Sequence, residues 1–114
     1  MEIEHDDSLW GRMNDPTAAG TIRGPCGDEM EFYLYICNGV IEDVKYHTDG
    51  CEDTRLCGAV AARQVKGKSI AEALNISAGD VIDVGGCGTG EGRHCAILAV
   101  STLYRALADY LLKP

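Results

Sequence analysis

The stretch that decides the fold reads EMEFYLYICNGVIEDVKYHT and covers residues 29–48. Apolar residues occupy its even positions from Met30 to Ile36, which is the period of a strand with one buried face. Asn38-Gly39 is typical of a tight hairpin turn, because both residues tolerate a left-handed backbone. The stretch therefore predicts two antiparallel strands joined at this turn.

Two registers of this hairpin are open to the sequence. A two-residue loop pairs Ile36 with Ile41 but places Leu34 opposite Asp43. A three-residue loop over Cys37–Gly39 gives the pairs Ile36 with Val40, Phe32 with Val44, and Met30 with Tyr46. We expect the three-residue loop, because it keeps the apolar faces matched and lets the glycine take the left-handed position.

The segments around the hairpin complete the predicted fold. Residues 18–22 are expected to add a third, short strand, and Ser69 and Glu72 form the pattern of a capping box. We expect helices over residues 54–66, which are rich in Ala, Leu and Val, over 69–74 and 77–84, and over 94–112, where apolar residues recur at helical spacing. We therefore expect an α+β fold in which a small antiparallel sheet of about three strands carries helices packed on one face.

Nothing in the sequence divides the chain, so we expect residues 1–114 to form a single domain. Residues 1–17 are expected to be a loosely ordered lead-in, with a short amphipathic turn at 8–13 that packs Trp10. Five glycines between Gly85 and Gly92 predict a flexible loop before the last helix.

Composition restricts the function. The 114 residues carry a net charge of −8, and 46% of them are hydrophobic, which argues against disorder, nucleic-acid binding and attachment to anionic membranes. We expect no stretch near the ~20 residues that span a bilayer, and residues 1–7 lack the features of a signal peptide. The expected compartment is the cytoplasm, where six cysteines are thiols or metal ligands more readily than disulfides.

Three of the cysteines lie in suggestive local settings. Cys26 lies in a Gly/Pro-rich turn before a strand, Cys51 directly precedes a helix, and Cys95 is expected in the first turn of the last helix. With Asp28 and His94 they make a soft-metal donor set that contains one carboxylate. Helix N-termini favour the thiolate form. The alternative is three separate buried cysteines and a turn aspartate.

Short motifs recur along the chain in a fixed order. They are Gly-Pro-Cys-Gly-Asp at 24–28, Val-Ile-Glu-Asp at 40–43, Thr-Asp-Gly-Cys at 48–51, Val-Lys-Gly-Lys-Ser at 65–69, His-Cys-Ala-Ile-Leu-Ala at 94–99 and Ala-Asp-Tyr at 108–110. In this order and spacing the sequence, from about residue 14 to its end, resembles the IscU/NifU N-terminal family of iron–sulfur cluster assembly scaffolds.

The resemblance implies a role for each residue of the donor set. Cys26, Cys51 and Cys95 would be cluster ligands, and Asp28 would be the non-thiolate ligand or the group that keeps the cluster labile. His94 would be an alternative fourth ligand. Cys95 would also accept persulfide sulfur.

The resemblance also implies cofactors and partners. The chain would be a scaffold, not an enzyme, that takes iron and persulfide sulfur from a cysteine desulfurase. It would build a labile [2Fe-2S]-type cluster and pass it to apo-proteins. Proteins of this family are also often found with zinc, because Cys or His ligands with a carboxylate satisfy a tetrahedral site. A monomer is expected without the cluster, with association of chains on loading.

The chain departs from the family in two places. Glu52-Asp53 follows Cys51 where the family often has glycine, which adds negative charge beside the site. The Leu-Pro-Pro-Val-Lys segment that a chaperone pair reads in the family is absent, and the Gly-rich residues 85–93 stand in its place.

Other functions stay open on the sequence. One is a zinc-binding sulfur acceptor that activates a cysteine desulfurase, and another is a thiol enzyme in which His94 serves Cys95 as base. Cys57 is expected to pack as a small apolar side chain, and Cys37 to lie outside the site. Cys87, in the Gly-rich loop, is equally compatible with a spare ligand, a resolving thiol and an exposed cysteine without a role.

Overall fold

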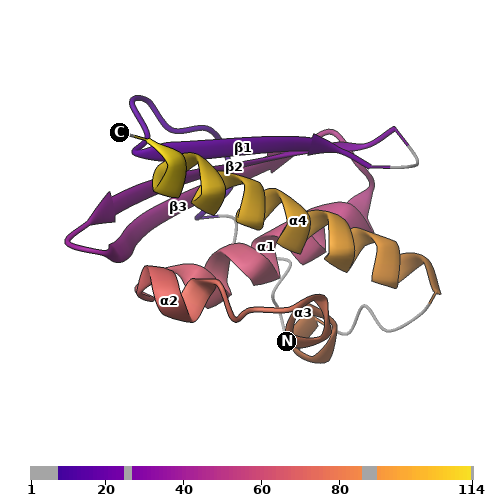
Figure 1. The fold of residues 1–114 in the computed structure, drawn as a ribbon. Helices are drawn as coiled ribbons and strands as arrows, with labels where there is room; N and C mark the ends of the chain where they lie inside the picture. The colour runs from indigo at the N-terminus through magenta and orange to yellow at the C-terminus, as the bar shows by residue number, and fades with distance from the viewer. Residues whose placement is uncertain (1–7, 25–26, 86–89, 114) are drawn as a thin grey trace.

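The computed structural model describes residues 8–24, 27–85 and 90–113, and shows a three-stranded sheet with helices on one face (Figure 1). In chain order the elements are β1 (Ala18–Arg23), β2 (Glu29–Cys37), β3 (Val40–Thr48), α1 (Glu52–Val65), α2 (Ile70–Ala73), α3 (Ala78–Gly85) and α4 (Gly90–Leu112). The strand order is β1-β2-β3, and both pairs are antiparallel. The predicted α+β class is confirmed.

The hairpin uses the register that the sequence argument rejected. Ile36 pairs with Ile41 across a two-residue turn in which Asn38 and Gly39 have φ of 55° and 77°. The register then shifts by one residue next to Tyr35 and Ile36, so that Leu34 lies opposite Val44. A β-bulge inserts one extra residue into one strand. Here it removes the mismatch with Asp43 that had favoured the longer loop.

The bulge decides which residues of β3 face the core. Ile41, Val44, Tyr46 and Thr48 are buried, whereas Val40, which we expected on this face, is only half-buried. On β2 the even residues from Met30 to Ile36 are buried as expected. One extra residue thus moves the start of β3 by one position and leaves the rest of the strand in phase.

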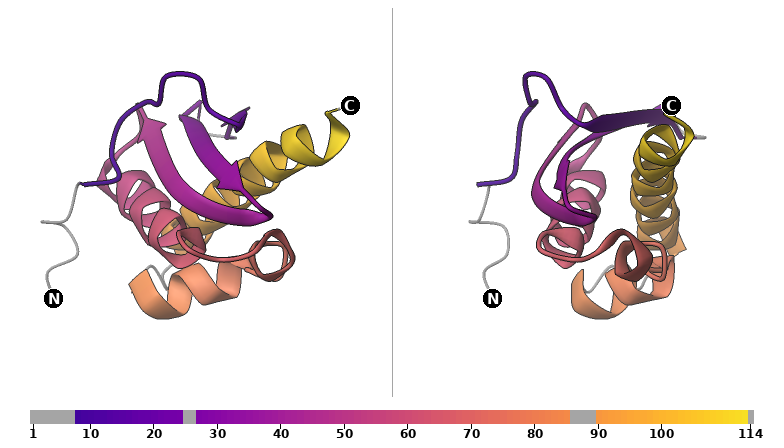
Figure 2. Two further views of the ribbon diagram at one scale, coloured as in Figure 1. Left: turned by 90° about the vertical axis from the view of Figure 1, so that its left-hand side faces the viewer. Right: turned by 60° about the vertical axis from the view of Figure 1, so that its left-hand side comes forward.

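Helices α1 and α4 cover the buried face of the sheet. Figures 1 and 2 show α4 along β1 and α1 beneath β3, with α2 and α3 connecting them at one end. β1 approaches α4 so closely that a Cβ on Gly20 would lie 2.5 Å from the backbone nitrogen of Ala106. The largest fully buried side chains include Tyr46, Phe32 and Leu103.

The helix boundaries follow the sequence closely, with one shift. The capping box at α2 is present, since Ser69 Oγ accepts from the Glu72 nitrogen at 3.1 Å and Glu72 Oε1 accepts from the Ser69 nitrogen at 2.9 Å. α4 begins at Gly90, four residues before the predicted start at His94. Cys95 therefore lies in the second turn of α4, and the expectation of a first-turn position was wrong.

One helix of the described residues is long and apolar enough to cross a membrane by length and composition alone. It is the 19-residue segment His94–Leu112 of α4, with a mean hydropathy of 1.4. The expectation that no stretch approaches this length was wrong. In the fold 44% of this window is buried, and Leu103 and Leu107 pack fully buried in the core. The segment thus serves as a core helix of the domain.

Both outer edges of the sheet are partly covered. On the β3 edge, Tyr46 exchanges backbone hydrogen bonds with Leu9 and Gly11, at 3.0 and 2.8 Å. On the β1 edge, the backbone nitrogen of Ala19 donates to Asp109 Oδ2 of α4 at 3.1 Å.

Trp10 fixes the N-terminal segment to the domain. The centroid of its ring lies 4.7 Å from that of His47. The Arg55 guanidinium carbon lies 4.0 Å above the same ring, which is a cation–π contact. The prediction that this segment packs Trp10 is confirmed. His47 is half-buried beneath this indole.

Candidate functional site

One buried hydroxyl group marks the site. Thr54, in the first turn of α1, is only 1% exposed. Its Oγ1 donates to Asp28 Oδ2 at 3.1 Å and lies 3.3 Å from Cys95 Sγ and 3.6 Å from Cys51 Sγ. Three of the predicted site residues, from three separate parts of the chain, therefore converge on one atom.

Backbone and side-chain hydrogen bonds hold the chain on either side of these residues. The start of β2 is tied to the end of β3, because Thr48 Oγ1 donates to the Glu29 carbonyl at 2.6 Å and the Glu29 nitrogen donates to Asp49 Oδ1 at 2.9 Å. Ahead of β2, the Gly24 nitrogen donates to the Asp28 carbonyl at 2.6 Å and closes the turn. Asp28 and Cys51 therefore lie next to each other at the same end of the sheet.

Gly50 makes this close packing possible. A Cβ at this position would lie 2.7 Å from Asp28 Oδ2 and 2.9 Å from Thr54 Cβ. Gly50 does not have a positive φ, so space alone requires the glycine. The Thr-Asp-Gly-Cys motif thus contains a packing requirement as well as a ligand candidate.

Cys51 is exposed and lies at the N-cap of α1. The hydrogen bond from the Thr54 backbone N–H does most to lower the pKa of the Cys51 thiol. Partial burial and the Asp53 carboxylate act in the opposite direction, but the hydrogen bonds prevail. The expectation that this helix start favours thiolate is borne out for Cys51.

Two of the other predicted residues are placed differently. Cys95 is half-buried on α4 and reaches the hydroxyl of Thr54. His94 is exposed, and its side chain makes no hydrogen bond to another described residue. Cys26, the remaining predicted ligand, and Cys87 lie outside the described residues.

The other cysteines lie apart from this cluster. Cys57 is fully buried in the core, as predicted, and Cys37 is half-buried at the end of β2 beside the hairpin turn. No disulfide joins Cys37, Cys51, Cys57 and Cys95 to one another.

Sequence reasoning missed Thr54 and the reason for Gly50. Thr54 follows Cys51 by three residues, and residues three apart on a helix lie on the same face. This spacing was a signal that a polar side chain would stand beside the candidate ligand. Nothing in the sequence indicated that the same side chain would also reach Asp28 and Cys95.

The donor chemistry suits a soft or borderline cation. Thiols and a carboxylate bind iron and zinc, and a carboxylate is the harder and weaker partner among them. Within residues 8–24, 27–85 and 90–113, no three His, Cys, Asp or Glu side chains are already arranged around a common metal position. The described donors point to Thr54 Oγ1 instead, so metal binding would require their rotation away from this hydroxyl.

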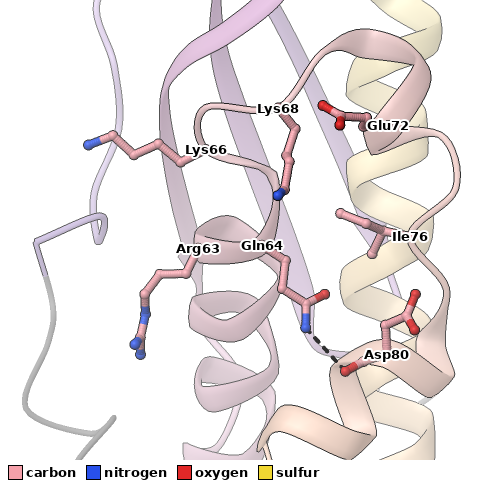
Figure 3. A pocket seen from close by; sticks show the side chains of 7 residues that line it. All are labelled: Arg63, Gln64, Lys66, Lys68, Glu72, Ile76 and Asp80. Atoms are coloured by element: carbon pink, nitrogen blue, oxygen red, sulfur yellow. Dashed lines mark hydrogen bonds between the residues drawn. The ribbon is translucent and has the colours of Figure 1, made fainter.

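A hollow of about 570 Å³ lies near the other end of α1 (Figure 3). In Figure 3 Lys68 and Gln64 lie on one side of it and Glu72, Ile76 and Asp80 on the other, and Gln64 Nε2 donates to the Asp80 carbonyl at 3.1 Å. Arg63 and Lys66 point away from it in this view. Its lining mixes both signs of charge and contains none of the predicted ligands. It plays no part in the site.

Comparison with known proteins places this arrangement in a family. A family model described as the NifU-like N-terminal domain matches residues 6–114. The chain belongs to this family. The NifU-like chain is 36% identical over 104 residues to the iron–sulfur cluster assembly scaffold protein IscU 1 of Archaeoglobus fulgidus, covering 90% of this chain and 68% of that protein. It is 34% identical over 104 residues to the IscU scaffold protein of Haemophilus influenzae, covering 90% and 82% of the two.

Solved structures agree on the fold. A SUF-system protein from Fervidobacterium islandicum superposes with a TM-score of 0.79 at 22% identity, covering 94% of the NifU-like chain and 92% of that structure. The N-terminal part of a NifU-like protein from Brucella abortus gives 0.75 at 18% identity, with 99% and 92% covered. The resemblance predicted from the ordered motifs is confirmed.

Proposed function

We propose that this NifU-like chain is an iron–sulfur cluster assembly scaffold. It accepts iron and persulfide sulfur, assembles a labile [2Fe-2S]-type cluster and transfers the cluster to apo-proteins. The supporting observation is the convergence of Asp28, Cys51 and Cys95 on the hydroxyl of Thr54. Relatives at 34–36% identity are named as scaffolds of this kind, so the function is binding and transfer without catalytic turnover.

Sulfur enters the site through Cys95 in this proposal. The Cys95 thiolate attacks the outer sulfur of a persulfide on a cysteine desulfurase, a new S–S bond forms on Cys95, and the desulfurase thiolate leaves. Conversion of this sulfur to sulfide takes two electrons from a partner reductant. The half-buried position of Cys95 on α4 leaves part of its side chain accessible for this step.

Asp28 makes the cluster transferable. Sites made only of cysteine hold clusters firmly, whereas a carboxylate is a harder and weaker ligand for iron. We expect Asp28→Ala to retain a reconstituted cluster longer than the unaltered chain, measured as the decay of visible absorption in the presence of a chelator. Decay at the unaltered rate would contradict this role.

The test of the function is anaerobic reconstitution with ferrous iron, L-cysteine and a cysteine desulfurase, followed by addition of an apo-ferredoxin. We expect a coloured species that passes its cluster to the ferredoxin and that is lost in Cys26→Ala, Cys51→Ala and Cys95→Ala. Cys37→Ala is the matched control, because Cys37 lies at the hairpin end of β2, and this variant should load normally.

A second function shares the same donor set. Thiols with a carboxylate also satisfy tetrahedral zinc, and a zinc-binding sulfur acceptor that activates a cysteine desulfurase would use the same residues. The reconstitution separates the two functions. A chain that keeps zinc, forms no cluster and raises the activity of the desulfurase is the sulfur acceptor.

A further inference from the structure

The hydroxyl of Thr54 is fully used by the three side chains around it. A threonine hydroxyl offers one hydrogen to donate and two lone pairs that accept. Its hydrogen goes to Asp28 Oδ2, and its two lone pairs suit the S–H groups of Cys51 and Cys95. The hydrogen and the two lone pairs of the hydroxyl therefore each have a partner, and its hydrogen-bonding capacity is fully used.

Thr54 lies in the first turn of α1, so its hydroxyl has no preceding helical turn to bond. A threonine inside a helix ordinarily bonds to a backbone carbonyl of the preceding turn, as Thr102 does with the Leu98 carbonyl at 2.7 Å in α4. Thr54 directs its hydroxyl at side chains from the β1–β2 turn, the start of α1 and α4. The hydrogen bonds therefore serve the site more than they serve the helix.

We propose that Thr54 is a positioning residue that holds the candidate ligands Asp28, Cys51 and Cys95 together, ready to receive metal. The inference rests on the proposed function and adds a residue to it. By engaging one oxygen of Asp28, the hydroxyl leaves the other oxygen to ligate, so the carboxylate binds through one atom. By lying between the two sulfur atoms, it keeps both thiols close to the position that metal will occupy.

The hydrogen bonds to Thr54 oppose one part of metal binding and favour another. Loading requires the thiols to lose their protons to solvent and to turn from Thr54 Oγ1 to the metal, which costs the hydrogen bonds they make there. The gain is that Asp28, Cys51 and Cys95 need no long-range search before they bind. Groups that hold metal ligands in place are commonly worth about 10–100-fold in metal affinity when they are removed.

The experiment measures Zn²⁺ affinity by competition with a chromophoric chelator, and thiolate-to-metal charge-transfer absorption with Co²⁺, under anaerobic conditions. Thr54→Val keeps the shape of the side chain and removes the hydroxyl, and we expect it to bind Zn²⁺ about 10–100-fold more weakly. Thr54→Ser restores the hydroxyl and should bind like the unaltered chain. Thr102→Val is the matched control, because it removes a buried threonine hydroxyl away from the site and should leave affinity unchanged.

Three outcomes overturn the proposal. If Thr54→Val binds Zn²⁺ as tightly as the unaltered chain, the hydroxyl does not position the ligands. The same conclusion follows if Thr54→Ser, which keeps the hydroxyl, binds Zn²⁺ as weakly as Thr54→Val. An unaltered chain without cysteine-dependent Zn²⁺ or Co²⁺ binding removes the metal site and the proposed function together. Circular dichroism verifies folding, and Thr54→Ala, which suits a helix, replaces the valine variant if that one unfolds.

Discussion

Substitution of Gly50 by alanine tests the packing on which the site depends. The new Cβ would lie 2.7 Å from Asp28 Oδ2 and 2.9 Å from Thr54 Cβ, whereas ordinary contacts begin at 3.4 Å. The Asp28 carboxylate can rotate away, but Thr54 is buried in the first turn of α1 and would have to retreat by about half an ångström. Overpacking of this kind costs about 1–3 kcal/mol. The smaller entropy of the unfolded alanine chain offsets about 0.5 kcal/mol of it.

Thermal unfolding of the metal-free protein gives the first measurement. After this offset the net cost is about 0.5–2.5 kcal/mol, and for a domain of this size 1 kcal/mol corresponds to about 4 °C, so we expect Gly50→Ala to melt about 2–10 °C lower. Zinc affinity should fall as well, because displaced Asp28 and Thr54 side chains no longer meet at 3.1 Å. Gly79→Ala is the control, since its Cβ would meet only Ser77 Oγ, at 3.5 Å. A Gly50→Ala protein that melts and binds zinc like the unaltered chain would refute the packing argument.

Three further substitutions examine other parts of the molecule. Asp53→Asn should lower the pKa of the Cys51 thiol further, because the charge of the Asp53 carboxylate raises it; the midpoint of the pH profile for alkylation of Cys51 should move to lower pH, and an unmoved midpoint would contradict this cause. Gly20→Ala should lower the free energy of unfolding, measured in urea, by about 1–3 kcal/mol, because its Cβ would lie within 3.0 Å of the α4 backbone. Stability equal to that of the unaltered chain would mean that β1 and α4 can move apart without loss of stability. Trp10→Ala should cost about 2 kcal/mol through lost ring and cation–π contacts, and a change below about 0.5 kcal/mol would show that the N-terminal segment contributes little.

The elements of the fold were predictable because each carries a local signal. Alternating residues on β2 and the capping box at Ser69 have one interpretation each, and both are present in the structure. The register of the hairpin was not predictable, because a bulge costs little locally and its benefit arises only from matching apolar faces along β3. The start of α4 lies at Gly90, within a run of glycines whose propensity disfavours helix.

The site was predictable in its residue types more than in its geometry. The ordered motifs indicated Asp28, Cys51 and Cys95 as members of one site. They did not indicate that a single hydroxyl would join them, because Thr54 and Cys95 are 41 residues apart and meet only through packing of α1 against α4. The three-residue spacing from Cys51 to Thr54 indicated a polar neighbour for one candidate ligand, and nothing in the sequence indicated its contacts with the other two.

The coverage of the two sheet edges has a consequence for self-association. An uncovered edge invites strands of other chains to add to it, and this is a common route to aggregates. Here Leu9 and Gly11 form hydrogen bonds with the Tyr46 backbone on the β3 edge, and Asp109 accepts a hydrogen bond from the Ala19 nitrogen on the β1 edge. Continuous sheets between copies of this chain are therefore blocked at these positions. Association between copies of this chain would then have to use other surfaces, and the exposed thiol at the start of α1 lies outside both of these stretches of sheet edge.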